Sequence, residues 1–391
     1  MSLTTAHTDS TASSGQASPA AKTSESDVGE ARPRGQEKQR GKMGSALGVR
    51  ISGTGSYVPD NVVTNEDLAA LGCDSEWIVR RTGIRQRRHA LPGQATSDLC
   101  VEASKRAMED AGLTADDLDL ILIATITPDH PTPSTACHVQ RRLGATAPAM
   151  DVGAACAGFM YALVTAANFI AAGNARHVLV VGADLMSRTV DPDDKKTYPL
   201  FGDAAGAAIV SRESITCDPE SPDRSGTDGS RRDPSMEHIG LLSYQLGSEG
   251  CGGEMLCIPA GGTRLAHSPE THADGQQYLK MDGRGVFKWA VRIFDESAKD
   301  VLAHADKQAS DLKLVILHQA NQRIIDSAVS DLNVDAERVF VNLDRYGNTS
   351  GASIPLALDE AARAGALQRG DLLLLCGFGA GLAWGTAIVR W

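Results

Sequence analysis

The chain has 391 residues and a formal net charge of −11 at pH 7, and 42% of its residues are apolar. An acidic chain repels the phosphate backbone, so a general nucleic-acid binder is excluded. No apolar run reaches 18 residues and the N-terminus lacks an apolar signal core, which argues against a membrane span and secretion. The eight cysteines include no C-x-x-C pair, so we expect a reduced, cytoplasmic protein without a metal site.

The composition divides the chain into four parts. Residues 1–45 are rich in Ser, Thr, Ala, Gly, Lys and Glu and predict a disordered N-terminal extension, with the fold beginning near Val49. Residues 218–236 are rich in Pro, Ser, Asp and Gly and predict a surface loop. This loop separates an N-terminal half, 46–217, from a C-terminal half, 237–391.

An arginine-rich segment follows the first predicted elements, and Trp77 lies beside it. Its five arginines fall within nine residues: Arg80, Arg81, Arg85, Arg87 and Arg88. The segment is either a solvated charged loop or a docking patch for an anion. A nucleotide-bearing cofactor with phosphates, or an acidic partner protein, would satisfy both the positive charge and the flat face of the indole ring.

Buried strands and helices alternate along both halves, as the apolar patterns predict. The predicted strands are Leu118–Thr125, His177–Ala183, Phe201–Val210 and Leu312–Gln319, and the predicted helices are Ser97–Gly112, Phe159–Gly173 and Met281–Ala305. Segments of the second half match the first at one offset of 194 residues. Leu312–Gln319 matches Leu118–Thr125, Gly347 matches Gly153, and Leu372–Leu375 matches Val178–Val181. A duplicated βα unit predicts a layered α/β fold with helices on both faces of mixed sheets.

Cys156 lies in the stretch Asp151–Phe159, where a short strand leads through a Gly/Ala turn into an apolar helix. Unpaired N–H groups and the helix dipole at such a position favour a thiolate, so we expect a lowered pKa and a nucleophile. A buried structural cysteine is the alternative.

Two further side chains lie at equivalent strand ends and turns. His318 ends the strand of the second copy, and Asn348 lies in its turn, so the duplication brings both toward Cys156. A thiol, an imidazole and a carboxamide would supply a nucleophile, a proton handler and a hydrogen-bond donor. The run Gly377–Gly385 predicts a glycine-rich loop that could form an oxyanion hole with the Cys156 amide.

In combination, five segments resemble β-ketoacyl-acyl-carrier-protein synthase III of the thiolase superfamily. They are EWIVRRTGIRQRR, DVGAACAGF, LHQANQRI, YGNTSGASIPLAL and GFGAGLAWG, and the resemblance covers Val49 to Trp391. It implies a duplicated, five-layered αβαβα fold with two mixed sheets around buried helices, and a homodimer. It also implies a decarboxylating condensation of an acyl-CoA primer with malonyl-acyl-carrier protein that starts fatty-acid synthesis. Acyl-CoA would be a substrate, so no cofactor is expected.

The resemblance assigns roles by matching motifs. Cys156 would be acylated, His318 and Asn348 would promote decarboxylation, and the amides of Cys156 and Ala380 would form the oxyanion hole. The remaining matches are coenzyme A or substrate contacts at Trp77, Arg81, Phe287 and Asn321, and carrier-protein docking by Gln319–Arg323.

The chain departs from the familiar bacterial form at several of these positions. Lys195, Lys196 and Arg284 replace residues near coenzyme A, and Thr132 replaces a phenylalanine that closes the acyl pocket of the dimer mate. A smaller residue there would admit a longer or branched primer. Three other functions stay open: an acyltransferase that primes a polyketide pathway or acylates an alcohol or amine, a cysteine hydrolase, and a non-catalytic thiolase-fold scaffold.

Overall fold

The computed structural model describes residues 41–213 and 239–391. They contain two five-stranded sheets. The first sheet has the order β2-β8-β7-β5-β6, in which β5 runs parallel to β6 and β7 and β8 runs antiparallel to β7 and β2. The strands are β2 (Val49–Tyr57), β5 (Leu120–Ala124), β6 (Ala149–Val152), β7 (His177–Leu185) and β8 (Asp203–Arg212).

The second sheet repeats this mixed pattern with the order β1-β9-β14-β13-β12. Here β12 pairs in parallel with β13, and the other neighbours are antiparallel. The strands are β1 (Lys42–Leu47), β9 (Gly240–Ser248), β12 (Leu314–Leu317), β13 (Leu372–Gly379) and β14 (Ala383–Arg390).

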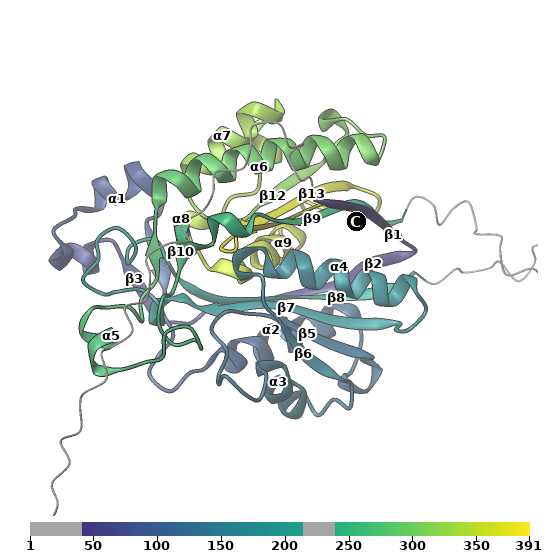
Figure 1. Ribbon diagram of the computed structural model, residues 1–391. Helices are drawn as coiled ribbons and strands as arrows, with labels where there is room; N and C mark the ends of the chain where they lie inside the picture. The colour runs from purple at the N-terminus through teal and green to yellow at the C-terminus, as the bar shows by residue number, and fades with distance from the viewer. Residues whose placement is uncertain (1–40, 214–238) are drawn as a thin grey trace, which may run out of the picture. The chain divides into compact units, whose positions relative to one another are not determined.

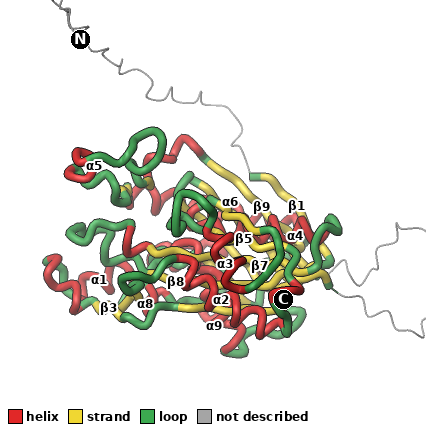
Figure 2. Tube along the Cα trace, turned by 90° about the horizontal axis from the view of Figure 1, so that it is seen from below, coloured by secondary structure: helices red, strands yellow, loops and turns green. Residues whose placement is uncertain are grey.

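Helices form three layers around the two sheets (Figure 1). The central layer is α4 (Gly158–Ala171) and α9 (Ser353–Arg363), which share one apolar cluster with both sheets. The outer layers are α2 (Thr96–Ala111) with α3 (Thr135–Leu143), seen from below in Figure 2, and α6 (Gly283–His304) with α7 (Gln322–Leu332). The predicted five-layered αβαβα fold is therefore confirmed.

Burial on both faces explains why the central strands are apolar throughout. In β5, Leu120 and Leu122 pack against the central helices, whereas Ile121 and Ile123 pack against α2 and α3. Alternate side chains of a strand point to opposite faces, so a strand between two helix layers needs apolar residues at every position.

Smaller elements surround the ends of the sheets. They are β3 (Val62–Thr64), α1 (Ser75–Thr82), β4 (Gln86–Arg88), β10 (Leu256–Cys257), α5 (Pro269–Ala273), β11 (Lys280–Met281) and α8 (Leu343–Tyr346). Among the residues described, no helix is both long and apolar enough to cross a membrane.

The predicted boundary of the N-terminal extension is wrong at its end. Residues 42–47 form β1, an edge strand of the second sheet, with Lys42 opposite Leu246 and Leu47 opposite Gly240. Main-chain hydrogen bonds hold this strand, and they need no apolar side chains, so composition did not reveal it. The predicted loop at 218–236 lies outside the described residues.

The duplication is present, but its offset changes by one residue along the chain. Leu120 of β5 and Leu314 of β12 begin equivalent strands 194 residues apart. From the next turn onward the offset is 195, as Gly158 and Ser353 begin α4 and α9. The single offset of 194 therefore misaligns the second half of each copy by one residue.

Candidate active site

Cys156 lies in the short 3₁₀ turn η3 (Ala155–Ala157), between the end of β6 and the first residue of α4. Ala155 before it adopts a left-handed backbone with φ of 46°, a conformation that costs an L-residue about 1–2 kcal/mol. This turn directs the cysteine toward the second half of the chain. Only 7% of Cys156 is exposed.

The equivalent turn of the second copy meets Cys156 there. It is η9 (Ser350–Ala352), and its Ser350 Oγ lies 3.3 Å from Cys156 Sγ. The prediction that the two helix starts converge is therefore confirmed. Ser350 was not among the predicted site residues; at the offset of 195 it is the equivalent of Ala155, and Gly351 is the equivalent of Cys156.

His318 directly follows β12, as predicted, and only 2% of it is exposed. Its Nδ1 lies 2.7 Å from Ser353 Oγ, and the Phe378 ring packs edge-on with ring centroids 5.4 Å apart. Burial lowers the pKa of His318 to about 3, so the imidazole is neutral at pH 7. Ser353, which orients the ring, was also missed from the sequence.

Asn348 is held on both its main chain and its side chain. Its N–H donates to Leu200 O at 2.8 Å, and its carbonyl accepts from Gly202 N at 3.0 Å. Its Oδ1 accepts from Ser350 N at 2.9 Å, which leaves the NH₂ group as the free end of the amide.

These three residues line one cavity of about 160 Å³ together with Phe287, Asn321 and Ala380. The rest of the wall is mostly apolar. Its other residues include Ile126, Met186, Leu200, Phe201, Leu256, Leu279, Met281, Val286, Ile324 and Phe378. The structure thus brings together six of the predicted site residues around a space suited to an apolar chain.

The predicted glycine-rich loop is mainly two strands. Gly377–Gly379 end β13, residues 380–382 form a turn, and β14 begins at Ala383. Gly379 lets this strand approach Cys156, because a Cβ at position 379 would lie 2.8 Å from the Cβ of Cys156. Ala380 then follows directly at the cavity wall.

The expected lowering of the Cys156 pKa is wrong for this structure. Burial raises the pKa of the thiol to about 12, the hydrogen bond from Ser350 lowers it, and the charge of Asp184 raises it again. Removing a thiolate from water outweighs the favourable dipole at the helix start. Cys156 is therefore a neutral thiol at rest, and it needs a proton acceptor to react.

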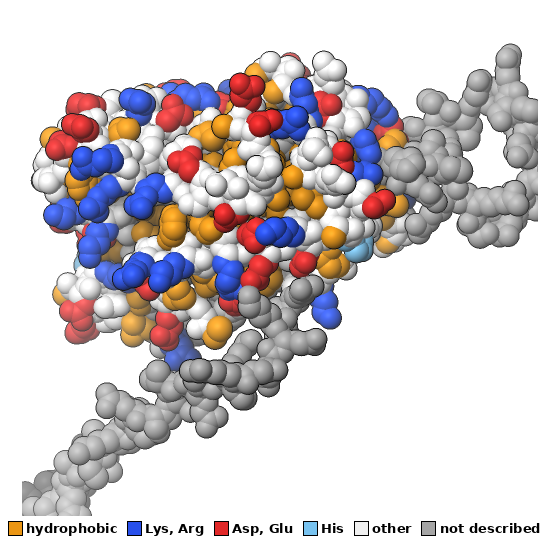
Figure 3. Space-filling view, turned by 90° about the horizontal axis from the view of Figure 1, so that it is seen from above, with side chains coloured by type: hydrophobic (Ala, Val, Ile, Leu, Met, Phe, Trp, Pro, Cys, Tyr) orange, Lys and Arg blue, Asp and Glu red, His pale blue; other side chains and the backbone are white. Residues whose placement is uncertain are grey.

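A continuous row of predicted substrate contacts leads outward from the cavity. Arg323 lies over the Phe287 ring at 5.8 Å, and Asn321 Nδ2 donates to Arg81 O at 3.2 Å. The Arg81 guanidinium lies 4.4 Å from the centre of the Trp77 ring. Lys and Arg side chains gather toward the end that carries α1 (Figure 3). Lys195, Lys196 and Arg284 are also exposed.

Arg87 does not belong to the proposed anion patch. It is fully buried and donates to Asn65 Oδ1 at 2.9 Å and to Pro199 O at 2.7 Å. Burial lowers the pKa of Arg87 to about 10. Its guanidinium thus joins β4 to Pro199, which precedes Leu200, the residue whose carbonyl accepts from Asn348 N. The role of Arg87 is therefore structural. Arg80, Arg81 and Arg85 remain exposed.

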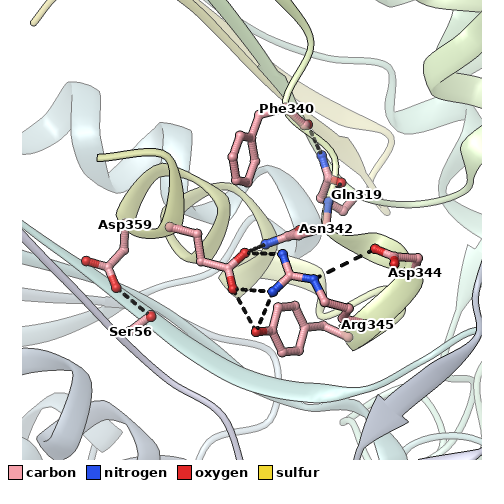
Figure 4. Close-up of polar contacts among 9 residues, drawn as sticks. Ser56, Gln319, Phe340, Asn342, Asp344, Arg345 and Asp359 are labelled. Carbon is pink, nitrogen blue, oxygen red and sulfur yellow. Dashed lines mark hydrogen bonds and ion pairs between the residues drawn. The ribbon is translucent and has the colours of Figure 1, made fainter. Parts of the chain in front are cut away.

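Gln319 is likewise not a docking residue, because only 1% of it is exposed. Its amide donates to Phe340 O at 3.3 Å and accepts from Asn342 N at 3.1 Å (Figure 4). Asn342 and Arg345 both donate to Glu360 at 2.8 Å. This network, buried at Gln319 and Asn342 and exposed at Arg345, joins the end of β12 to the segment before Asn348. Of the two residues predicted to dock the carrier protein, Arg323 is the exposed one.

Thr132 is exposed and does not line the cavity of its own chain.

Asp184 is, after Ser350 and Ser353, the third residue near the site that the sequence analysis missed. It is fully buried, and its Oδ2 accepts from Gly351 N at 2.9 Å. A lone aspartate at the end of an apolar strand carries no motif that marks it.

The comparisons agree with this geometry. Two family models, described as 3-oxoacyl-[acyl-carrier-protein] synthase III and its C-terminal part, match residues 150–221 and 302–391. A β-ketoacyl-[acyl-carrier-protein] synthase III of Rhodopirellula baltica is 72% identical over 349 residues, covering 89% of this chain and all of the relative.

Solved structures extend the agreement. The 3-oxoacyl-[acyl-carrier-protein] synthase III of Aquifex aeolicus is 41% identical, with a TM-score of 0.76 over 88% of this chain and all of that one. The priming β-ketosynthase of the R1128 polyketide pathway is 33% identical, with a TM-score of 0.77 over 92% and 98%. The chain therefore belongs to the β-ketoacyl-acyl-carrier-protein synthase III family of condensing acyltransferases, as its motifs predict.

Proposed function

We propose that this chain condenses a short acyl-CoA with malonyl-acyl-carrier protein through an acyl-Cys156 intermediate. The product is β-ketoacyl-acyl-carrier protein, and the reaction starts fatty-acid synthesis. The observation that carries the proposal is the shared cavity, where Cys156, His318 and Asn348 meet below an apolar wall. The names of the relatives support the same reaction.

In the first half-reaction, Cys156 attacks the acyl thioester and coenzyme A leaves. The apolar wall holds the acyl chain and excludes water, which protects the acyl-enzyme from hydrolysis. The Cys156 and Ala380 amides stabilise the tetrahedral oxyanion, and one such donor is worth about 3 kcal/mol.

In the second half-reaction, His318 and Asn348 bind the malonyl thioester oxygen. Gln319 N donates to Ser353 Oγ at 3.4 Å, which favours the arrangement in which the hydroxyl donates to His318 Nδ1. Nε2 then carries the ring hydrogen. That N–H and the Asn348 NH₂ stabilise the enolate left by decarboxylation, and its carbon attacks the acyl-Cys156 carbonyl.

Coenzyme A and the carrier protein reach the cavity along one row of side chains. Trp77, Arg81 and Asn321 are joined by direct contacts, and Phe287 with Arg323 lies between them and the thiol. We assign Trp77, Arg81, Asn321 and Phe287 to coenzyme A, and Arg323 to the acidic carrier protein.

Each step of the proposed reaction uses side chains and substrate atoms, so no resident cofactor or metal is required. Cytoplasmic location stays a prediction.

A second copy of the chain would complete the acyl pocket. β6 is an edge strand whose Met150 is 41% exposed, and Thr132 is exposed near the same sheet end. Open edge strands pair readily, so we propose a homodimer in which Thr132 faces the partner's acyl chain. Sedimentation equilibrium at micromolar concentration tests the dimer.

Priming of a polyketide pathway is the second candidate function, because the R1128 priming β-ketosynthase covers most of the chain. Intact-protein mass spectrometry after incubation with a panel of acyl-CoAs, with Cys156→Ser alongside, tests both. We expect one acyl adduct on the wild type, none on the variant, and discharge by malonyl-acyl-carrier protein. An adduct that malonyl-acyl-carrier protein does not discharge would favour another acyltransferase, and no adduct would favour a scaffold.

A further inference from the structure

His318 and Asn348 reach the cavity from two separate segments of the chain, and helix α9 contacts the first of them directly. The His318 Nδ1 lies 2.7 Å from the hydroxyl of Ser353, the residue that begins α9. Asn348 lies at the end of the segment 342–348, which contains α8 and precedes the turn before α9. How this segment is fixed to α9 therefore helps to set the position of Asn348 relative to His318.

Glu360, in the last turn of α9, binds this segment with both carboxylate oxygens (Figure 4). Its Oε2 accepts from Asn342 Nδ2 and from Arg345 Nη2, each at 2.8 Å. Its Oε1 accepts from Arg345 Nη1 at 2.9 Å and from the Tyr346 hydroxyl at 2.7 Å. Burial and the bond to Glu360 raise the pKa of Tyr346 to about 12, so this hydroxyl keeps its proton and donates at neutral pH. One carboxylate thus ties three positions of the segment to α9.

The segment is in tight contact with the residue that holds the Asn348 main chain. Gly347 N donates to Leu343 O at 2.9 Å, and a Cβ at Gly347 would lie 2.8 Å from Leu200 O. Leu200 O is the same carbonyl that accepts from Asn348 N. Because there is so little space at this contact, a displacement of residues 342–346 also displaces Asn348.

A second set of contacts leads back to His318. Asn342 N donates to Gln319 Oε1 at 3.1 Å, and Gln319 directly follows His318. Gln319 N donates to Ser353 Oγ at 3.4 Å, at the start of α9. These residues, together with Glu360 and α9, form a closed circuit of contacts. Glu360 does not line the cavity, so any effect that it has on a substrate must pass through this circuit.

We propose that Glu360 is a positioning residue for the decarboxylation step. Its carboxylate holds the Asn348 NH₂ group at the distance from the His318 ring that lets both bind one thioester oxygen. The inference rests on the proposed function, which gives these two side chains that role. Cys156 lies in η3 of the first copy, outside the circuit, so its acylation does not depend on Glu360.

Glu360→Gln tests this role with little change in side-chain size. A carboxamide has one acceptor oxygen, so its NH₂ group would face donors that the second carboxylate oxygen now accepts from. We expect decarboxylation of malonyl-acyl-carrier protein to fall on the order of 100-fold, the cost of a 1 Å shift in a reacting group. Acylation of Cys156 by acyl-CoA, followed by intact-protein mass spectrometry, should keep the wild-type rate. A crystal structure of the variant should show Asn348 displaced from its wild-type position relative to His318.

Asp359→Asn is the matched control, because it makes the same chemical change one residue earlier in α9. Asp359 is 2% exposed, and its carboxylate accepts from three side chains outside the circuit, namely Thr54, Ser56 (Figure 4) and Arg363. This variant should lose stability in urea unfolding and keep the wild-type rates of both half-reactions. Should Glu360→Gln not fold, Tyr346→Phe removes one bond to Glu360 and should slow decarboxylation about fivefold.

Three results would overturn the proposal: unchanged decarboxylation in the folded variant, equal falls in both half-reactions, or a fall without displacement of Asn348. The same fall in Asp359→Asn would also overturn it. If the wild type neither acylates Cys156 nor decarboxylates malonyl-acyl-carrier protein, the proposed function fails. The crystal structures then still decide the positioning role, because Asn348 moves in Glu360→Gln if the role is correct and stays in place if it is not.

Discussion

Gly379→Ala tests how closely β13 must approach the nucleophile. The added Cβ would lie 2.8 Å from Cys156 Cβ, 3.0 Å from its N and 3.2 Å from its Sγ. Carbon atoms in contact prefer about 3.5–4.0 Å, so the methyl group would displace the cysteine or the strand by roughly 0.7–1 Å. Both the core and the reacting atom would be affected.

Two magnitudes follow from this displacement. Overpacking a buried site costs about 1–3 kcal/mol of unfolding free energy. A shift of 1 Å in a reacting group costs on the order of 100-fold in rate. We therefore expect a modest loss of stability and a large loss of Cys156 acylation, measured by urea unfolding and by rapid-quench intact mass spectrometry.

Gly262→Ala is the matched control, because a Cβ there meets nothing within 4 Å and its φ is not left-handed. It should keep both the wild-type stability and the wild-type acylation rate. If Gly379→Ala kept the wild-type rate of Cys156 acylation and the wild-type free energy of unfolding, the close approach of β13 to Cys156 would contribute neither to catalysis nor to stability.

Four further predictions concern single side chains. Thr132→Phe should narrow the range of acyl chain lengths that form an adduct, by filling the partner's pocket, and an unchanged range would argue against the proposed dimer contact. Ser353→Ala should slow malonyl decarboxylation about fivefold while acylation persists, because it loses one hydrogen bond worth about 1 kcal/mol. Equal losses in both rates would contradict the assignment. Trp77→Ala should raise KM for acyl-CoA more than it lowers kcat, as steady-state kinetics would show, since the ring lies far out on the substrate path. Burial lowers the pKa of His318 from 6.5 to about 3, so the unfolded state binds more protons between these values and stability falls as the pH drops from 6.5 toward 3. His318→Gln should flatten this fall in urea unfolding at pH 7 and pH 5, and an unchanged slope would place the effect elsewhere.

The predicted fold follows from local patterns that tertiary contacts do not override. The apolar runs within Leu118–Thr125, His177–Ala183 and Leu312–Gln319 are typical of strands covered on both faces, and β5, β7 and β12 lie there. The duplicated βα unit in the sequence also predicted that the strands and helices are arranged in layers. The motifs around Cys156, His318 and Asn348 were enough to predict that these side chains meet.

Only the tertiary structure showed where segments held by backbone hydrogen bonds lie and which polar side chains are buried. β1 joins the second sheet through backbone pairing, and its residues KMGSAL carry no strand pattern. Gln319 and Arg87 are polar residues of charged or polar segments, yet both are buried because neighbouring carbonyls and amides bind them. Polarity predicts exposure only where no such partners exist.

The electrostatics of the site show the same division. The sequence by itself determined the family, the candidate nucleophile and its two polar neighbours, because these depend on residue types at motif spacings. Only the tertiary structure decided that Cys156 is desolvated, that Ser350 contacts it, and that Gly351 donates to the buried Asp184. Burial and proximity between residues 167 or 194 positions apart arise from packing the two copies together, and no local pattern encodes them.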